Sequence, residues 1–290
     1  MTETRKPSPV PLGLLNGLDD FDLVITPKGA THGNLRDLWR YRELLLLLCW
    51  RDIKIRYRQT IMGVGWAVAQ PLLSMIVFAC ILGRLAPQPS TGVPYPLCCY
   101  AALLPWTYFA NAVSRSSTSL VSNSSLVTKI YFPRAIITVA SALPGLVDFS
   151  AALVAFVPLF LFFHFVPALA SLWLVPAIMA ACFVLVLGLS FWLSAIGVRI
   201  RDVGFLIPFV IQIWMFATPV IYSGKLVPER YRILAYFNPM FGIVDGFRAA
   251  VLGLPFPTLP VAMSVAIAMV LFFTGFYFFR ATEKGVADVI

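Results

Sequence analysis

An acidic pair near the N-terminus is the clearest group in this 290-residue chain whose residue types and spacing could do chemistry. Asp20-Phe21-Asp22 has the Asp-x-Asp pattern that can hold a divalent cation through carboxylate oxygens. The pair lies in a tail rich in Pro and Gly, without a globular domain around it. A solvated acidic turn therefore explains the pair better than a metal site does.

The sequence lacks the motifs of a nucleotide hydrolase or a metal hydrolase. Its Gly224-Lys225 pair is followed by Leu226, without the glycine-rich loop of a nucleotide site. The two histidines, His32 and His164, belong to no His-Glu-x-x-His helix. We therefore expect no catalytic residue, no metal site and no cofactor bound by this chain, and we expect it not to be an enzyme.

One acidic residue, Asp148, falls inside an otherwise charge-free apolar stretch. A charged side chain at the centre of a membrane helix costs roughly 2.5 to 3.5 kcal/mol on insertion scales, so its carboxylate should face protein or water. Three roles remain open for it: lining or gating a transport path, a structural hydrogen bond between helices, or simple protonation.

Two groups of aromatic residues could contact sugars through their ring faces. Aromatic residues can equally anchor helices at a membrane interface or pack between them, so both interpretations stand. The six residues of the candidate glycan path are Trp106, Tyr108, Phe109, Trp214, Phe216 and Tyr222.

These residues belong to a chain whose composition suits a membrane. Hydrophobic residues make up 60% and charged residues 12%, whereas about a quarter of the residues in a soluble protein are charged. A membrane-spanning helix needs about 20 apolar residues. Six windows qualify, at residues 61–83, 95–114, 135–164, 169–198, 203–224 and 257–279.

We therefore predict an all-α membrane protein with a six-helix transmembrane domain over residues 61–280. A cytosolic tail at residues 1–33 and an interface helix at residues 34–60 precede the domain, and a cytosolic tail at residues 281–290 follows it.

The net charge of +9 comes from Lys and Arg that lie mostly between or beside the apolar windows. They concentrate in the N-terminal region and in alternate loops, which predicts a multi-pass protein of the cytoplasmic (inner) membrane with both termini cytosolic. The N-terminal region has no apolar core of a signal peptide. Anionic membrane lipids are then the expected acidic partner, and nucleic acid is not.

Residues 34–58 predict an amphipathic helix along the cytosolic surface. Apolar residues recur at near-helical spacing, although the run Leu44 to Leu48 blurs the two faces. A seventh span is the alternative, but Glu43 and Arg51 enclose too few apolar residues for it. The candidate interface residues are Trp39, Arg40, Arg42, Arg51, Lys54 and Arg58.

Residues 225–254 mix apolar and charged side chains, unlike any of the windows. Pro228, Asn238-Pro239 and Gly253 would break this segment into two short helices. We predict an external hairpin that dips back toward the membrane, and a structured external loop without a gating role is the alternative.

Several short motifs, in order and spacing, resemble the permeases of ATP-binding-cassette polysaccharide exporters, which export O-antigen, capsule or teichoic acid. The resemblance runs from about residue 25 to the C-terminus. The motifs are Leu38-Trp39-Arg40-Tyr41-Arg42-Glu43-Leu44-Leu45, Arg51-Asp52-Ile53-Lys54-Ile55-Arg56-Tyr57-Arg58-Gln59-Thr60, Gly63-Val64-Gly65-Trp66, Tyr95-Pro96, Leu104-Pro105-Trp106, Lys129-Ile130-Tyr131-Phe132-Pro133-Arg134, Arg199-Ile200-Arg201-Asp202 and Asn238-Pro239-Met240.

The resemblance implies a homodimer that works with two copies of a separate nucleotide-binding ATPase subunit, which would bind ATP and Mg. It also implies a lipid-linked polysaccharide as substrate. Between the second and third spans it implies a cytosolic coupling helix, and before the sixth span it implies external re-entrant gate helices. The ATPase-coupling residues that it indicates are Asn123, Leu126, Val127, Lys129, Ile130, Tyr131, Phe132 and Arg134. The external gate residues are Tyr231, Asn238, Pro239 and Arg248.

The local sequence suits a coupling helix. Residues 122–125 can cap a short helix, and Pro133 would stop it before the third span. Leu126, Val127 and Ile130 would offer an apolar face to a groove on the ATPase. An ordinary charged turn that obeys the positive-inside rule is the alternative.

Two other functional classes fit the sequence less well. An ion-coupled secondary transporter normally needs several intramembrane ionisable groups and repeated halves, and the chain offers Asp148 and at most His164. A membrane-embedded glycosyl or acyl transferase needs a clustered catalytic set, and only Asp20-Phe21-Asp22 hints at one.

Overall fold

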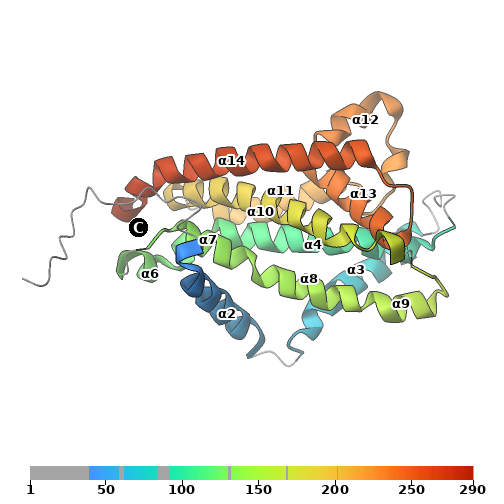
Figure 1. The fold of residues 1–290 in the computed structure, drawn as a ribbon, viewed down its shortest axis with the longest axis horizontal. Coiled ribbons are helices and arrows are strands. Elements are labelled where there is room, and N and C mark those ends of the chain that lie inside the picture. The colour runs from blue at the N-terminus through green and yellow to red at the C-terminus, as the bar shows by residue number, and fades with distance from the viewer. Residues whose placement is uncertain are drawn as a thin grey trace, which may run out of the picture.

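The computed structural model describes residues 39–58, 62–83, 92–129, 132–167, 169–200 and 202–289. The Asp20-Phe21-Asp22 pair, the predicted tail at residues 1–33, His32, Ile130 and Tyr131 lie outside these ranges. All regular structure in the described ranges is helical (Figure 1). The α-helices are α2 (Arg42–Arg58), α3 (Gly65–Leu82), α4 (Tyr95–Ser117), α5 (Ser119–Ser122), α6 (Ser124–Lys129), α7 (Ala135–Ala142), α8 (Pro144–Val154), α9 (Phe156–Phe162), α10 (Leu174–Arg199), α11 (Val203–Ala217), α12 (Glu229–Tyr236), α13 (Pro239–Leu252) and α14 (Thr258–Val289), with 3₁₀ turns η3 (Leu169–Ser171) and η4 (Gly224–Leu226).

Four stretches of the described chain are long and apolar enough to cross a membrane. They are α3, the consecutive helices α7 to α9 (Ala135–Phe162), α10, and Thr258–Glu283 of α14. These four correspond to the first, third, fourth and sixth predicted windows, so the all-helical membrane class is confirmed. The two remaining windows correspond to α4 and α11.

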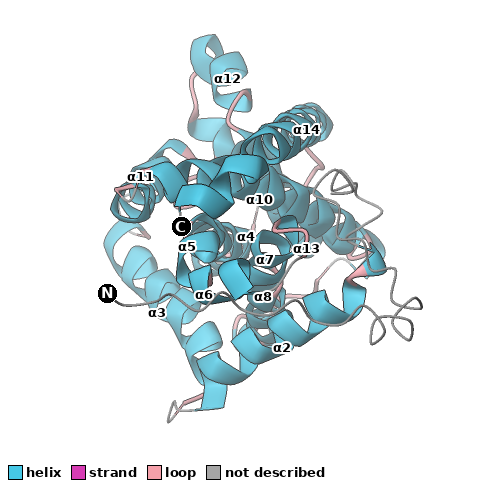
Figure 2. Ribbon diagram, turned by 90° about the vertical axis from the view of Figure 1, so that its left-hand side faces the viewer, coloured by secondary structure: helices cyan, strands magenta, loops and turns pink. Residues whose placement is uncertain are grey.

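Helix α4 is long but less apolar, and its position in the bundle explains this. It lies at the centre of the end-on view (Figure 2) and contacts α3, α7, α8, α10, α11 and α13. Most of its residues are buried, including polar Ser116 and Ser117. Because neighbouring helices shield α4, its surface does not need the apolar composition of a lipid-facing helix.

Helix α11 ends at Ala217, earlier than the predicted window boundary at Gly224. Thr218 is extended, with φ −105° and ψ 140°, and it precedes Pro219. A residue before proline is driven out of the helical region by the proline ring, so the helix stops there. The resulting 15-residue helix is shorter than the window that hydropathy defined.

The predicted breaks between residues 225 and 254 are confirmed. Asn238 caps α13 by accepting a 3.1 Å hydrogen bond from the amide of Met240, and Pro239 occupies the first turn. Gly253 ends the helix at φ 66°, in the left-handed region that glycine adopts most easily. Nearly all of α13 is buried against α4, α10 and α14, so it belongs to the core of the bundle.

Helices α10 and α14 make the most extensive contact in the bundle. Their backbones approach closely where two glycines meet, because a Cβ on Gly275 would lie 2.3 Å from the carbonyl oxygen of Gly188. Small residues allow this kind of close approach between membrane helices.

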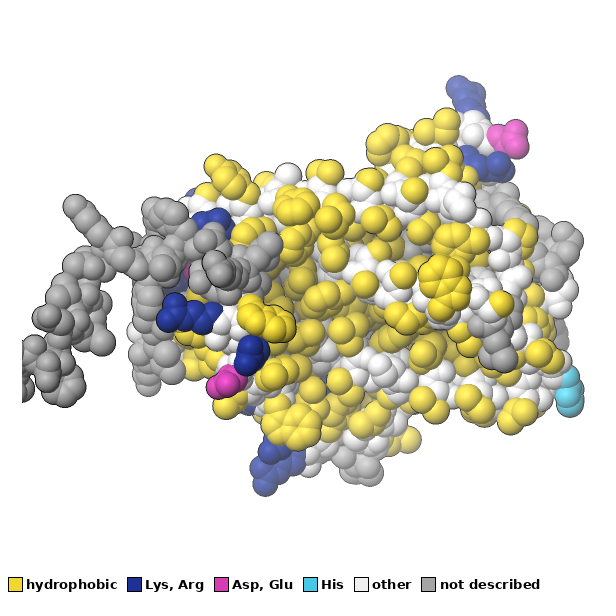
Figure 3. Space-filling view, in the orientation of Figure 1, with side chains coloured by type: hydrophobic (Ala, Val, Ile, Leu, Met, Phe, Trp, Pro, Cys, Tyr) yellow, Lys and Arg dark blue, Asp and Glu magenta, His cyan; other side chains and the backbone are white. Residues whose placement is uncertain are grey.

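The two ends of the bundle differ in what they hold. Helix α6 and the C-terminal end of α14 lie at one end, and α12 lies near the other (Figure 1). The first of these ends is tied together by Arg134, whose amide donates a 3.0 Å hydrogen bond to Oε1 of Glu283. Apolar side chains cover the face between the ends, and charged side chains gather near the end with α2 and on α12 (Figure 3).

Candidate functional site

Helix α2 has two apolar faces. One face packs on α7 and α8 and includes Leu44, Leu45 and the buried Leu48, and Tyr41 just before the helix packs on the same core. The other face leaves Leu46, Leu47 and Trp50 exposed. The near-helical spacing predicted one apolar face, but the buried Leu48 and the exposed Leu46 and Trp50 lie on two different surfaces. The run of leucines from Leu44 to Leu48 had already blurred that prediction.

Basic residues on the exposed face of α2 lie over aromatic rings. The guanidinium carbon of Arg42 is 5.5 Å from the ring centroid of Trp39, and Nζ of Lys54 is 5.5 Å from that of Trp50. Arg40 and Arg58 are also exposed. Rings beside basic groups are typical of a helix at the membrane surface, where both find suitable neighbours.

Arg51 is the predicted interface residue that turns toward the protein. Its Nη2 is 2.8 Å from Oδ1 of Asp52 and 2.8 Å from Oδ1 of Asn123. Asn123 lies between α5 and α6, and its Nδ2 donates to the carbonyl of Ser119. The structure thus links two residues that the sequence placed in separate functional groups, the interface helix and the coupling segment.

Cys49 also lies on α2, between the two apolar faces. Burial raises the pKa of its thiol, and the nearby carboxylate of Asp52 acts in the same direction. Because the thiolate is the reactive form of cysteine, Cys49 should react slowly with thiol reagents at neutral pH.

The coupling segment turns its apolar residues inward. Val127 is 8% exposed, Phe132 is buried, and Leu126 packs partly against the same core. The face that the sequence assigned to an ATPase groove therefore contacts this chain itself. Among the described side chains of residues 121–128, those of Val121, Ser122, Ser125 and Thr128 are exposed, and none of these four was among the indicated coupling residues.

Asp148 meets three residues from two other helices. Arg56 of α2 forms an ion pair with it, Tyr57 donates a hydrogen bond to it, and Nη2 of Arg115 on α4 lies 3.7 Å from its carboxylate. The Asp148 side chain is only 14% exposed. The expectation that this carboxylate faces protein or water rather than lipid is confirmed.

A cavity of about 160 Å³ lies beside this cluster, and we call it the α2–α4 cavity. It lies among the end of α2, the start of α3, the middle of α4 and the start of α8. Its polar lining residues are Arg56, Tyr57, Gln70, Thr107, Asn111 and Asp148, and Trp66, Tyr108 and Phe149 add aromatic walls. Sequence reasoning missed Gln70 and Asn111, although a polar amide within an apolar span is itself a signal.

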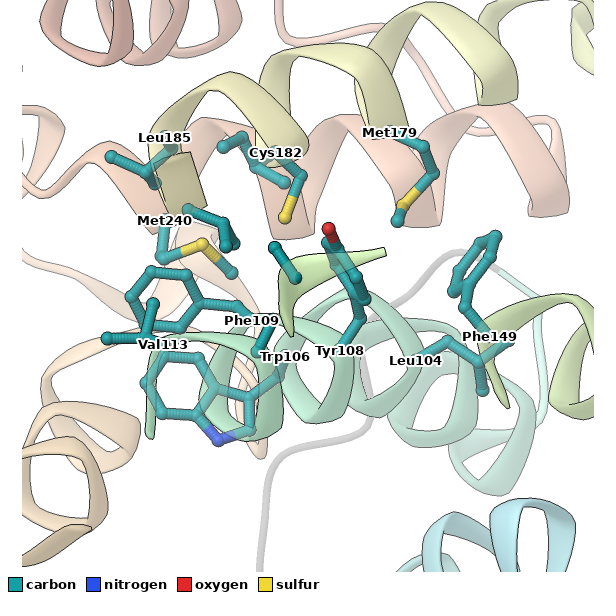
Figure 4. Packing of buried hydrophobic residues seen from close by; sticks show 14 of the residues in the cluster. Leu104, Trp106, Tyr108, Phe109, Val113, Phe149, Met179, Cys182, Leu185 and Met240 are labelled. Carbon is teal, nitrogen blue, oxygen red and sulfur yellow. The ribbon is translucent and has the colours of Figure 1, made fainter. Parts of the chain in front are cut away.

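The aromatic residues of α4 do not share one surface. Trp106 and Phe109 lie on the side of Met240, whereas Tyr108 points its hydroxyl toward Cys182 of α10 (Figure 4). The rings of Phe109 and Trp214 meet edge to face at 5.3 Å. Trp106, Tyr108 and Phe109, the three candidate path residues of α4, are all buried, so they pack the centre of this chain.

Phe216 near the end of α11 and Tyr222 beyond that helix are more accessible. Phe216 is 61% exposed and Tyr222 is half-buried, with its hydroxyl donating to the carbonyl of Phe216 at 3.3 Å. Nε1 of Trp214 donates a 3.0 Å hydrogen bond to Oδ1 of Asn238, which joins a candidate path residue to a candidate gate residue.

Arg248 is a buried residue among the predicted gate residues, at 5% exposure. Its guanidinium donates to the carbonyls of Cys98 at 3.2 Å and Pro219 at 2.7 Å, and pairs with Asp245 at 2.8 Å. Carbonyls freed where a membrane helix ends must find donors inside the protein, and Arg248 supplies them after α11. Tyr231, by contrast, is exposed on α12.

Residues 43–252 match the family of ABC-2 type transporters. The match covers well over half of the chain, so the chain belongs to this family of membrane transport permeases. The resemblance seen in the sequence motifs is confirmed.

The names of individual relatives are more specific than the description of the family. Two proteins from Klebsiella pneumoniae, each called O-antigen export system permease protein RfbA, are 24% identical over 207 residues, which is 71% of this chain and 79% of theirs. The protein of the same name from Myxococcus xanthus is 26% identical over 262 residues, which is 88% of this chain and 98% of its own length.

Proposed function

We propose that this chain is the membrane-spanning permease of an ABC exporter that moves a lipid-linked, O-antigen-like polysaccharide from the cytosol across the cytoplasmic membrane. A separate nucleotide-binding subunit hydrolyses ATP to drive the movement. The observation that carries the proposal is the similarity to O-antigen export permeases over most of the chain, including 98% of the Myxococcus protein.

In this proposal the permease is a homodimer with two ATPase subunits. It spans the inner membrane six times, with α4 and α11 added to the four spans described above. The concentration of basic residues near the end with α2 favours cytosolic termini. The broadly exposed apolar side chains of α11, such as Phe205 and Phe209, suit contact with lipid or with the second copy.

The turn formed by α5 and α6 is the proposed contact for the ATPase. It lies at the end of the bundle that holds the C-terminal end of α14. Because Leu126 and Val127 face inward, the contact would use the exposed Val121, Ser125 and Thr128. The hydrogen bond from Arg51 to Asn123 would carry movement of this turn to α2.

Export by cells tests the proposed function. Cells that lack this permease but retain its ATPase should accumulate lipid-linked glycan inside and regain surface glycan when the chain is restored. An ATPase with a disabled Walker lysine should abolish the rescue. Surface glycan that is independent of this chain, or export that persists with the disabled ATPase, would disprove the proposal.

A further inference from the structure

The α2–α4 cavity has polar groups that this chain does not use. Among the described residues, the side-chain amides of Asn111, which is half-buried, and Gln70, which is exposed, have no hydrogen-bond partner, and both line the cavity. An amide offers donors and an acceptor together. Two such groups at a cavity near the membrane surface would be satisfied by a ligand, or by water, that both donates and accepts hydrogen bonds.

The size and walls of the cavity limit that ligand. Its volume of about 160 Å³ is below the roughly 300 to 1,000 Å³ of ordinary small-molecule sites, so it fits one ring-sized group rather than a lipid chain. Trp66 is 55% exposed and lines the cavity near the start of α3. The face of an aromatic ring is electron-rich and attracts the slightly positive C–H groups of a sugar ring.

The charged residues that line the cavity are Arg56 and Asp148, which balance each other, and Arg115 lies 3.7 Å from Asp148 without lining the cavity. The Arg56 guanidinium already pairs with Asp148, and a phosphate group in the cavity would meet that carboxylate. Sugar hydroxyls, in contrast, can donate to Asp148 and exchange hydrogen bonds with both amides.

We propose that the α2–α4 cavity binds one pyranose ring of the glycan. Gln70 and Asn111 bond its hydroxyls, Asp148 accepts from a further hydroxyl, and Trp66 stacks on the ring. This inference rests on the proposed function for its substrate class. It assigns sugar recognition to the space between α2, α3, α4 and α8, rather than to the buried aromatic residues Trp106 and Phe109.

Thiol protection tests the site directly on the full chain. The five native cysteines are replaced, Thr107→Cys places a thiol in the cavity wall, and the purified protein is labelled with a small methanethiosulfonate reagent. Methyl pyranosides should slow the labelling several-fold. The protection should disappear when Gln70→Ala and Asn111→Ala are added and should weaken with Trp66→Ala.

Matched controls use positions away from the cavity. Labelling of a thiol introduced by Ser122→Cys, at the exposed end of α5, should not respond to sugars. Trp173→Ala, which removes an exposed tryptophan before α10, should leave the protection of the Thr107→Cys thiol intact. Unchanged gel-filtration profiles show that the variants remain folded.

The outcomes separate the two proposals. A cavity thiol that never reacts, equal labelling with and without pyranosides, or protection that survives loss of both amides overturns the sugar site, even if export proceeds normally. Protection by inorganic phosphate instead of pyranosides overturns it in favour of an anionic headgroup. If pyranosides protect the cavity thiol specifically but cells export glycan without this chain, the sugar site stands and the proposed function is disproved.

Discussion

Nη2 of Arg51 on α2 donates a 2.8 Å hydrogen bond to Oδ1 of Asn123, in the turn between α5 and α6. Five residues further along the same helix, Arg56 pairs with Asp148 beside the α2–α4 cavity. The two contacts are about 7.5 Å apart along the axis of α2, at 1.5 Å per residue. Because a helix moves as a unit, displacement of the turn should reach Asp148 through α2.

The first prediction concerns this link. Arg51→Ala and Asn123→Ala should each reduce glycan export, because each removes the same hydrogen bond, worth about 1 kcal/mol at a partly exposed site. The double variant should therefore export about as well as either single variant. Arg58→Ala, which removes an exposed arginine from the same helix, is the control. Fully additive losses would show that the two residues act separately.

The second prediction concerns Asp148. Replacement by Ala should lower the free energy of unfolding of the purified protein by about 1 to 3 kcal/mol, because it removes the acceptor of Arg56 and Arg115. The loss should be smaller than for a fully buried pair, since both arginines are partly exposed. Removing Arg56 as well should restore part of the loss. Ser150→Ala, on the exposed side of α8, serves as control. A double variant less stable than Asp148→Ala would contradict the ion-pair explanation.

The third prediction separates docking from folding in the coupling segment. Val121→Asp with Thr128→Asp should leave the amount of folded protein in the membrane unchanged and weaken co-purification of the ATPase, since both side chains are exposed. Val127→Asp should instead reduce folded protein, because it buries a charge. The ATPase could instead bind the Val121→Asp/Thr128→Asp variant normally and fail to bind a folded Val127→Asp variant. That result would show that the inward residues form the docking face.

The fourth prediction concerns Arg248. Lysine at this position cannot reproduce the forked donors that reach the carbonyls of Cys98 and Pro219, so Arg248→Lys should destabilise the protein by about 2 kcal/mol. Thermal unfolding measures the loss. Arg232→Lys is the matched control, because Arg232 lies 3.5 Å from the exposed Glu229 and such surface pairs contribute little. Equal effects of the two substitutions would exclude the proposed role in holding the carbonyls.

The fifth prediction concerns orientation. In intact cells, an impermeant thiol reagent should label a cysteine placed at Glu229 and should not label one placed at Ser124, because α12 and α6 lie near opposite ends of the bundle. Native Cys49 should contribute little background, since its thiol pKa is raised. Labelling at Ser124 but not at Glu229 would reverse the topology.

The sequence by itself determined the membrane class, the family and the local breaks in the chain. Apolar length identifies spans without knowledge of neighbours, and Pro239 and Gly253 end helices through their own backbone geometry. Even the early end of α11 has a local cause that could have been read from Thr218-Pro219.

Only the tertiary structure decided which faces of these helices meet. Val127 and Trp106 are apolar residues whose sequence pattern fits either a docking surface or a core, and packing against this chain buries both. Arg51 and Asn123 are 72 residues apart, and Arg56 and Asp148 are 92 apart. Helical periodicity describes one helix at a time, whereas these contacts depend on how helices distant in sequence pack together, which is set by the shape and polarity of many side chains at once.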